Sequence, residues 1–310
     1  MTKLIVKDEM KAPASFGITE SKMIRLENIL VGTDFSAASD RALQYALALA
    51  RRYESKIFLV NVVLSDTTTL APEVMTRGEE LRLSAAQEEM GEFLISGRLR
   101  DVAHETLVER GQFWPTMQHL IEKHHIDLVV VGTEGTKSWQ KFFLGSGAEQ
   151  VFRQAKCPVL TVGPAVKDGA PKEIEFKKIL FATDFGLGAE REAEYAFSFA
   201  QENQANLTML HVVRHADDYT DEGLALKRAA ISHELSELAP AGSEAWCKVE
   251  MRMRLGDPAE EILAIAREMK ADLIVIGAKK EKSISAGHAL GGTAYHVVCA
   301  APCPVLSVRS

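Results

Sequence analysis

Residues 29–36 read ILVGTDFS, and the same pattern returns about 150 residues later, where residues 179–186 read ILFATDFG. A second pair follows, since residues 126–133 read IDLVVVGT and residues 271–278 read ADLIVIGA. The two halves also end alike, with CPVLTV at residues 157–162 and CPVLSV at residues 303–308. A period this long is typical of a duplicated domain rather than of a solenoid repeat.

The length and composition fit two domains. A chain of 310 residues with 46% hydrophobic content can form two units of about 140 residues, each with its own core. The segment between the repeats is polar and carries two prolines, which is typical of a linker. The predicted organisation is an N-terminal extension, a first domain, a linker and a second domain, at residues 1–24, 25–163, 164–175 and 176–310.

Composition also limits the partners. A net charge of −7 argues against a nucleic acid, because binding its phosphates requires a dense basic surface. No stretch approaches the roughly 20 apolar residues of a membrane span, and residues 1–24 lack the apolar core of a signal peptide. We therefore expect a cytoplasmic protein with no membrane partner. The nine histidines form no metal-ligand pattern, so no metal site is predicted from side chains.

Short apolar runs alternate with helix-like segments in both halves, which predicts an α/β fold of two tandem doubly wound parallel sheets. The run at 127–131 is almost entirely valine and leucine, as expected for a parallel strand covered on both faces. The predicted strands are 26–32, 56–63, 104–110, 127–131, 158–162, 178–182, 206–213, 245–255, 272–276 and 305–308.

Glycines follow the fourth predicted strand of the first half. Gly132 and Gly135 come directly after the strand, and Gly145 and Ser146 come at the start of the next helix. Glycines let main-chain amides approach phosphate oxygens, and a helix start adds unpaired donors and a favourable dipole. The alternative is that these are ordinary turn glycines and that Ser146 caps the helix. The spacing alone does not decide between the two interpretations.

The spacing from Gly132 to Ser146 resembles the nucleotide-binding signature of the universal stress protein family. The strand ending in Thr33-Asp34 and the closing Pro-Val-Leu strand are similar to that family as well, and the likeness covers nearly all of both halves. The resemblance implies two five-stranded domains of the adenine-nucleotide α-hydrolase-like kind. It also implies that ATP, with or without Mg²⁺, places its phosphates on Gly135, Gly145 and Ser146, with the ribose near Gly132.

The adenosine end of the nucleotide is implied to lie at the first two strands. By the resemblance, Thr33, Asp34 and main-chain groups around Val62 contact it. Independently of the family, a carboxylate beside the switch point of the sheet can accept hydrogen bonds from an adenine or a ribose hydroxyl. The alternative role for Asp34 is to cap the helix that starts near Ser36.

The second half departs from the signature. Asp184 and Gly277 are retained, but Lys280 replaces the second glycine, Gly291 arrives one residue late, and Gly292 stands where the serine is expected. A side chain then lies where the backbone is meant to approach phosphate. We predict one competent site, in the first half, and a degenerate second site that keeps Asp184, Gly277 and Gly291 without the phosphate cradle. The lysines of this loop either bind an anion or form a solvated surface.

Three functions are open at this point. The first is a cytoplasmic stress-response protein that binds ATP, hydrolyses it slowly or not at all, and regulates unidentified protein partners. The second is an adaptor that binds no nucleotide, and the third is a weak nucleotidase that uses Ser146 or Glu134. Changing Gly135 to the lysine of the second half would separate the first two. The resemblance further implies that the closing strands of the two halves pair, and it allows a homodimer that no residue pattern fixes.

Overall fold

The computed structural model describes residues 24–65, 72–133, 144–166, 175–214, 220–278 and 292–309. The chain forms two compact units. The first-repeat unit contains Arg25–Glu175 together with Ala278–Ser310, and the second-repeat unit contains Phe176–Gly277. The last helix and strand of the second repeat therefore belong to the first-repeat unit. Apart from Ile24, the predicted N-terminal extension lies outside the described residues.

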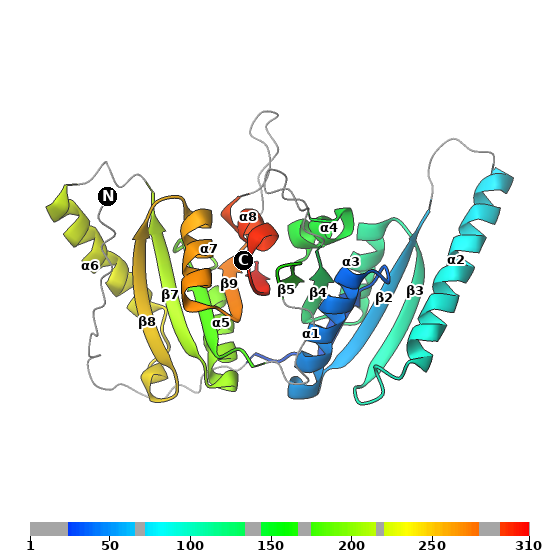
Figure 1. Ribbon diagram of the computed structural model, residues 1–310, viewed down its shortest axis with the longest axis horizontal. Helices are drawn as coiled ribbons and strands as arrows, with labels where there is room; N and C mark the ends of the chain where they lie inside the picture. The colour runs from blue at the N-terminus through cyan, green and yellow to red at the C-terminus, as the bar shows by residue number, and fades with distance from the viewer. Residues whose placement is uncertain are drawn as a thin grey trace. The chain divides into compact units, whose positions relative to one another are not determined.

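Strands and helices alternate in the first-repeat unit, as the sequence predicts (Figure 1). Its elements are β1 (Asn28–Gly32), α1 (Ala37–Tyr53), β2 (Lys56–Leu64), α2 (Pro72–Ile95), β3 (His104–Gly111), α3 (Phe113–Lys123), β4 (Leu128–Gly132), α4 (Ser146–Gln154), β5 (Val159–Val162), α8 (Thr293–Ala300) and β10 (Val305–Val308).

The second-repeat unit follows the same order up to its fourth strand. Its elements are β6 (Lys178–Ala182), α5 (Ala189–Asn203), β7 (Asn206–Val213), α6 (Asp221–Glu237), a 3₁₀ helix (Ser243–Ala245), β8 (Lys248–Leu255), α7 (Pro258–Met269) and β9 (Leu273–Gly277). The expected strand start at residue 245 is wrong, because the 3₁₀ helix occupies that position and β8 begins three residues later.

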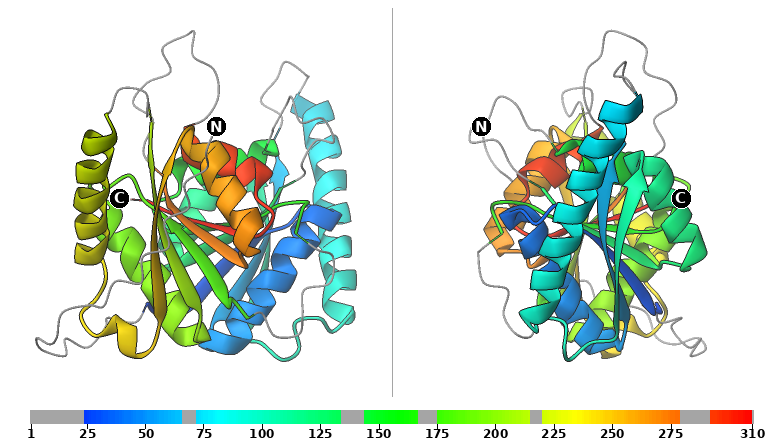
Figure 2. Two further views of the ribbon diagram at one scale, coloured as in Figure 1. Left: turned by 60° about the vertical axis from the view of Figure 1, so that its left-hand side comes forward. Right: turned by 90° about the vertical axis from the view of Figure 1, so that its right-hand side faces the viewer.

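The first-repeat strands lie in the order β3-β2-β1-β4-β5, and each adjacent pair is parallel. After β3 at one edge the chain returns to β4, which lies beside β1, so the winding direction switches between β1 and β4. Helices α1 and α3 lie on opposite sides of these strands (Figure 2). Order and layers together confirm the predicted doubly wound α/β fold. The second-repeat strands lie in the equivalent order β9-β6-β7-β8, again all parallel.

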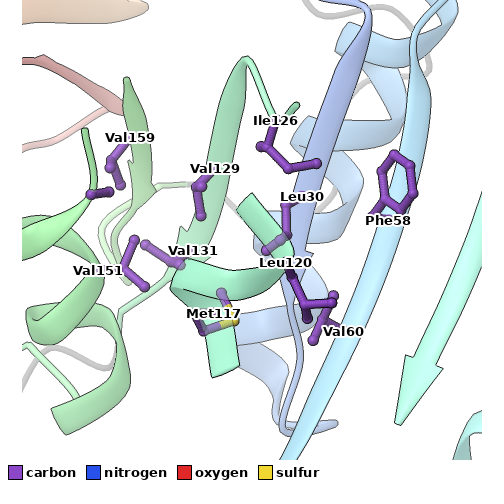
Figure 3. Close-up of a cluster of buried hydrophobic side chains, with 11 residues drawn as sticks. Leu30, Phe58, Val60, Met117, Leu120, Ile126, Val129, Val131, Val151 and Val159 are labelled. Atoms are coloured by element: carbon purple, nitrogen blue, oxygen red, sulfur yellow. The ribbon is translucent and has the colours of Figure 1, made fainter. Parts of the chain in front are cut away.

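One face of the first-repeat sheet packs on α3 and α4 (Figure 3). Alternate residues of β1, β2 and β4 point to this face, because successive side chains of a strand point to opposite sides. Met117 and Leu120 of α3 and Val151 of α4 cover them, and all three are buried. Each fully buried side chain of this size contributes about 1.5–3 kcal/mol of transfer free energy. This core fixes the positions of the strand ends beyond it.

The closing strands of the two repeats pair within the first-repeat unit. Strand β10 runs antiparallel to β5, with Leu306 opposite Leu160, and the Thr161 hydroxyl donates to the Val305 carbonyl at 3.2 Å. This confirms the predicted pairing of the closing strands. Cys247 and Cys303 are buried, and Cys157 and Cys299 are half-buried.

Candidate functional site

The end of β1 is a turn held by hydrogen bonds to β2 and by one within the turn itself. The Thr33 amide donates to Val60 O at 2.8 Å, and the Asn61 side chain donates to Thr33 O at 2.8 Å. The Thr33 hydroxyl accepts from the Phe35 amide at 3.0 Å, and Phe35 has a φ of 59°. A positive φ in a bulky residue is uncommon and is retained only where the surroundings determine it. The turn therefore presents Asp34 in a defined position.

Asp34 is exposed beside this turn, and its carboxylate accepts from the Ser36 amide at 3.0 Å. Partial burial opposes ionisation, but hydrogen bonds from Ser36 and Ser39 outweigh that effect and lower the pKa of Asp34. Helix α1 is capped by Ser36, whose hydroxyl accepts from the Ser39 amide. The alternative role for Asp34 as the helix cap is therefore wrong. Its carboxylate is an ionised, exposed group at the carboxyl-end edge of the sheet.

The end of β4 lies against the start of α1. A Cβ on Gly132 would lie 2.0 Å from the backbone oxygen of Ala38, so only glycine lets the helix approach this closely. The Thr133 amide donates to Val162 O at 3.0 Å, and the Thr133 side chain is buried. The packing of α1 thus gives Gly132 a structural reason to be glycine that requires no ligand.

The start of α4 is different, because no contact with the described residues requires its glycine. Gly145 is the N-cap, has ordinary backbone angles and provides no side-chain cap, and a Cβ on it would meet no described atom within 4 Å. Gly145 and Ser146 are both exposed. The first amides of a helix have no intrahelical partner, and they carry the positive end of the helix dipole. This end of α4 can therefore bind an anion.

Gly147, one residue further, lets α4 pack on α3. A Cβ there would lie 3.0 Å from Cζ of Phe113, the first residue of α3.

Strand β2 extends beyond β1 at the carboxyl-end edge of the sheet. Its pairing with β1 ends at Val60, whereas its pairing with β3 continues to Leu64. Val62 lies on this extension and is half-buried.

Six predicted site residues thus lie at the carboxyl-end edge of one parallel sheet or at the helix start that follows it, and they are Thr33, Asp34, Val62, Gly132, Gly145 and Ser146. Gly135, the seventh, lies outside the described residues. Sequence reasoning missed Asn61, which holds the Thr33 carbonyl. Its signal was available, because the equivalent residue of the second repeat, His211, is also polar and is likewise followed by two valines.

The second repeat builds the same turn after β6. The Thr183 hydroxyl accepts from the Phe185 amide and the Asp184 carboxylate accepts from the Gly186 amide, both at 3.0 Å. Nδ1 of His211 donates to the Thr183 carbonyl at 2.9 Å, in the role that Asn61 has in the first repeat. Burial lowers the pKa of His211. Asp184 therefore follows β6 in the same turn in which Asp34 follows β1.

Gly277 at the end of β9 has a different neighbour from Gly132. A Cβ on Gly277 would lie 2.1 Å from Oε1 of Glu192, a side chain that is only 7% exposed. Helix α5 begins at Ala189 with Gly188 as its N-cap and has no side-chain cap. A buried carboxylate thus lies at the second repeat's strand end, where the first repeat has helix backbone.

The start of α8 corrects one sequence alignment. Gly292 is the N-cap of α8, as Gly145 is of α4, and Thr293 is the first helical residue. A hydroxyl residue therefore occupies the position of Ser146, and Gly292 does not stand in its place. Lys280 and Gly291 lie outside the described residues, so the predicted loss of the phosphate cradle in the second repeat stays a prediction.

Neither a membrane-spanning helix nor a cluster of metal-binding side chains occurs in the described residues. No helix there is long and apolar enough to cross a membrane. Within the same ranges, no group of three or more His, Cys, Asp or Glu side chains is arranged to bind a metal ion.

The sequence profile of the universal stress protein family matches residues 25–163 and again residues 175–309. The chain belongs to the universal stress protein family. Membership places it among the stress-response proteins, and the double match confirms the tandem arrangement predicted from the repeats. The match also accounts for the fold, since each matched segment contains the complete strand and helix order of one repeat.

Individual relatives match one repeat or the whole chain. A universal stress protein of Thermus aquaticus is 39% identical over 140 residues, which is 43% of this chain and 99% of the relative. A putative universal stress protein of Staphylococcus aureus is 30% identical over 144 residues, covering 45% of this chain and 86% of the relative. The crystal structure of a universal stress protein from Archaeoglobus fulgidus matches with a TM-score of 0.65 at 21% identity, over 92% of this chain and 99% of the other. At 21% identity, the match to this structure shows that the two chains share a fold.

Proposed function

We propose that this universal stress protein binds ATP in its first repeat, hydrolyses it slowly or not at all, and acts in the cytoplasm as a nucleotide-dependent regulator of protein partners. The observation that carries the proposal is the start of α4. Gly145 is exposed, offers no side-chain cap, and has no described atom within 4 Å of its Cβ position, so a ligand can approach the backbone here. Phosphate is the ligand class that a helix start of this kind favours.

The other residues of this edge suit the rest of a nucleotide. The amides at the start of α4 and the Ser146 hydroxyl would hold the phosphates, together with Mg²⁺ where it accompanies ATP. The ionised Asp34 carboxylate can accept from a ribose hydroxyl or an adenine amine, and the turn at Thr33 holds it in place. These are binding groups rather than an activated nucleophile, which supports slow or absent hydrolysis. Partner regulation then follows if ATP favours one conformation of the chain over another.

The test is the variant Gly145→Asp. Aspartate is among the best N-cap residues, so the variant should be as stable as wild type or more stable by a few tenths of a kcal/mol. Its carboxylate would lie where the phosphates bind and repel them, so ATP affinity should fall by more than about a hundredfold, or 2.8 kcal/mol. Isothermal titration calorimetry with ATP, together with urea denaturation, measures both quantities.

The second repeat offers a matched control. Gly292 is also an N-cap glycine without a side-chain cap, and a Cβ on it would meet nothing within 4 Å. Gly292→Asp should leave ATP affinity unchanged, because the proposed site lies in the first repeat. If wild type binds no ATP, or if Gly145→Asp binds it as well as wild type does, the proposal is wrong. The first of these results would favour a nucleotide-independent adaptor.

A further inference from the structure

The other end of α4 is held by an arginine from the end of the chain. Arg309 follows β10 and is only 5% exposed. Its Nη1 donates to Arg153 O at 2.5 Å and its Nη2 donates to Phe152 O at 2.7 Å. These are carbonyls of the last turn of α4, which have no partner within the helix. A cation at this end also interacts favourably with the helix dipole.

Other residues of the C-terminal segment contact the same helix turn. The Tyr295 ring of α8 lies 6.1 Å from the Phe152 ring, and the Arg153 guanidinium stacks over Tyr295 at 5.2 Å. Strand β10 is itself fixed by its pairing with β5. We call the contacts of Tyr295 and Arg309 with α4 the C-terminal clamp. Through this clamp, residues that belong to the second repeat by sequence hold a helix of the first repeat.

Within the described residues, position 163 of the first repeat does not reproduce the clamp at α8. Gly163 follows β5 as Arg309 follows β10. A Cβ on Gly163 would lie 3.7 Å from Thr133 Oγ1 and 3.9 Å from Ala301 O. Ala301 is the C-cap of α8, so position 163 lies near the end of α8 as position 309 lies near the end of α4, but glycine has no side chain to donate.

Helix α4 has nine residues, a length of about 13.5 Å, so its two ends move together. We propose that Arg309 is a positioning residue for nucleotide binding: by fixing the last turn of α4, it fixes the amides of Gly145 and Ser146 that receive the phosphates. This inference rests on the proposed function. It gives the second repeat a role, since the repeat that lacks the glycine signature supplies the clamp for the one that has it.

The energetics favour a single position of α4. A buried guanidinium is costly unless its donors are satisfied, and it stays protonated in proteins. Burial lowers the pKa of Arg309, which reflects that cost. The Phe152 and Arg153 carbonyls accept hydrogen bonds from the Arg309 guanidinium, so displacement of α4 would break both bonds. By linkage, ATP bound at one end of α4 and Arg309 at the other should stabilise each other.

The test compares ATP with adenosine, which has no phosphates and so does not engage the start of α4. Arg309→Met removes the donors and keeps most of the side-chain volume, whereas Arg309→Lys keeps a charge and one hydrogen-bonding group. Arg254→Met is the matched control, because Arg254 is also largely buried, at 15% side-chain exposure, and pairs with Glu268 in the second-repeat unit. Dissociation constants for both ligands are measured by calorimetry on variants shown to be folded by circular dichroism.

We expect Arg309→Met to weaken ATP binding at least about fivefold and to change adenosine binding less than about twofold. Arg309→Lys should lie between wild type and Arg309→Met, and Arg254→Met should match wild type for both ligands. Equal weakening of ATP and adenosine would show a general structural role and overturn the inference, as would unchanged ATP affinity in Arg309→Met. If Arg309→Met does not fold, the Arg309→Lys comparison decides in the same way. Failure of wild type to bind ATP would instead overturn the proposed function.

Discussion

Thr33 and Asp34 show how one short sequence determines both a local structure and a chemical group. The Thr33 hydroxyl and the Asp34 carboxylate each accept a backbone amide two residues ahead, and the same two bonds recur at Thr183 and Asp184. Such side-chain to backbone bonds replace the bonds that the chain loses where a strand ends. The turn is therefore a structural feature of both repeats. Its use as a ligand contact requires the neighbouring helix start as well.

The Asp34 carboxylate gives a pH-dependent prediction for stability. Hydrogen bonds lower its pKa below the ordinary 3.8, so its contribution to stability is present above that pH and is lost as the pH falls through the lower, folded value. Asp34→Asn should be less stable than wild type at pH 7 by less than about 1 kcal/mol, because the group is exposed. Urea denaturation of both proteins should show the difference disappearing at acid pH. A difference that stayed constant as the pH fell below 3.8 would contradict this origin.

At the scale of elements, Gly132 and Gly145 flank the loop after β4 and differ in how closely neighbouring elements pack against them. Gly132→Ala forces a methyl group to within 2.0 Å of the Ala38 backbone oxygen, so α1 must shift, at a cost of about 2–3 kcal/mol. Gly145→Ala meets no described atom within 4 Å and should cost only about 0.5–1 kcal/mol, because alanine is a poorer N-cap residue than glycine. Urea denaturation of the two variants measures the contrast. Equal destabilisation by both substitutions would show that Gly145 is also required by packing.

Most strands and helices could be predicted from the sequence, because their cause is local. The run of valines in β4 and the helical spacing of α1 are buried in the structure as their patterns indicate. The start of β8 could not be predicted, because the 3₁₀ helix at Ser243–Ala245 depends on Gly242, whose φ is 78°. The helix start at Gly292 and Thr293 was misaligned because α4 and α8 differ in length, at nine and eight residues.

At the scale of the whole molecule, the duplication was visible in the sequence. The placement of α8 and β10 in the first-repeat unit was not. The repeated motifs predict two domains, and the pairing of β5 with β10 was expected from the family resemblance. The burial of Arg309 against α4 depends on contacts between residues more than 150 positions apart, and no pattern in one segment reports them. The position of the Glu192 carboxylate at Gly277 likewise depends on a contact between residues in different elements, although these are closer in sequence.

Glu192 distinguishes the strand end of the second repeat from that of the first. This side chain is a buried glutamate, whereas the equivalent first-repeat residue, Ala42, is apolar. On the proposed function, we expect the first repeat to bind ATP and the second repeat to support that binding.

The most direct test of the account is the number of ATP molecules bound per chain at saturation, measured by native mass spectrometry on wild type and on Gly145→Asp. A single ATP on wild type and none on Gly145→Asp is the predicted result. Two ATP molecules per wild-type chain would contradict the degenerate second repeat. No ATP on wild type, or ATP retained by Gly145→Asp, would contradict the proposed site at the start of α4.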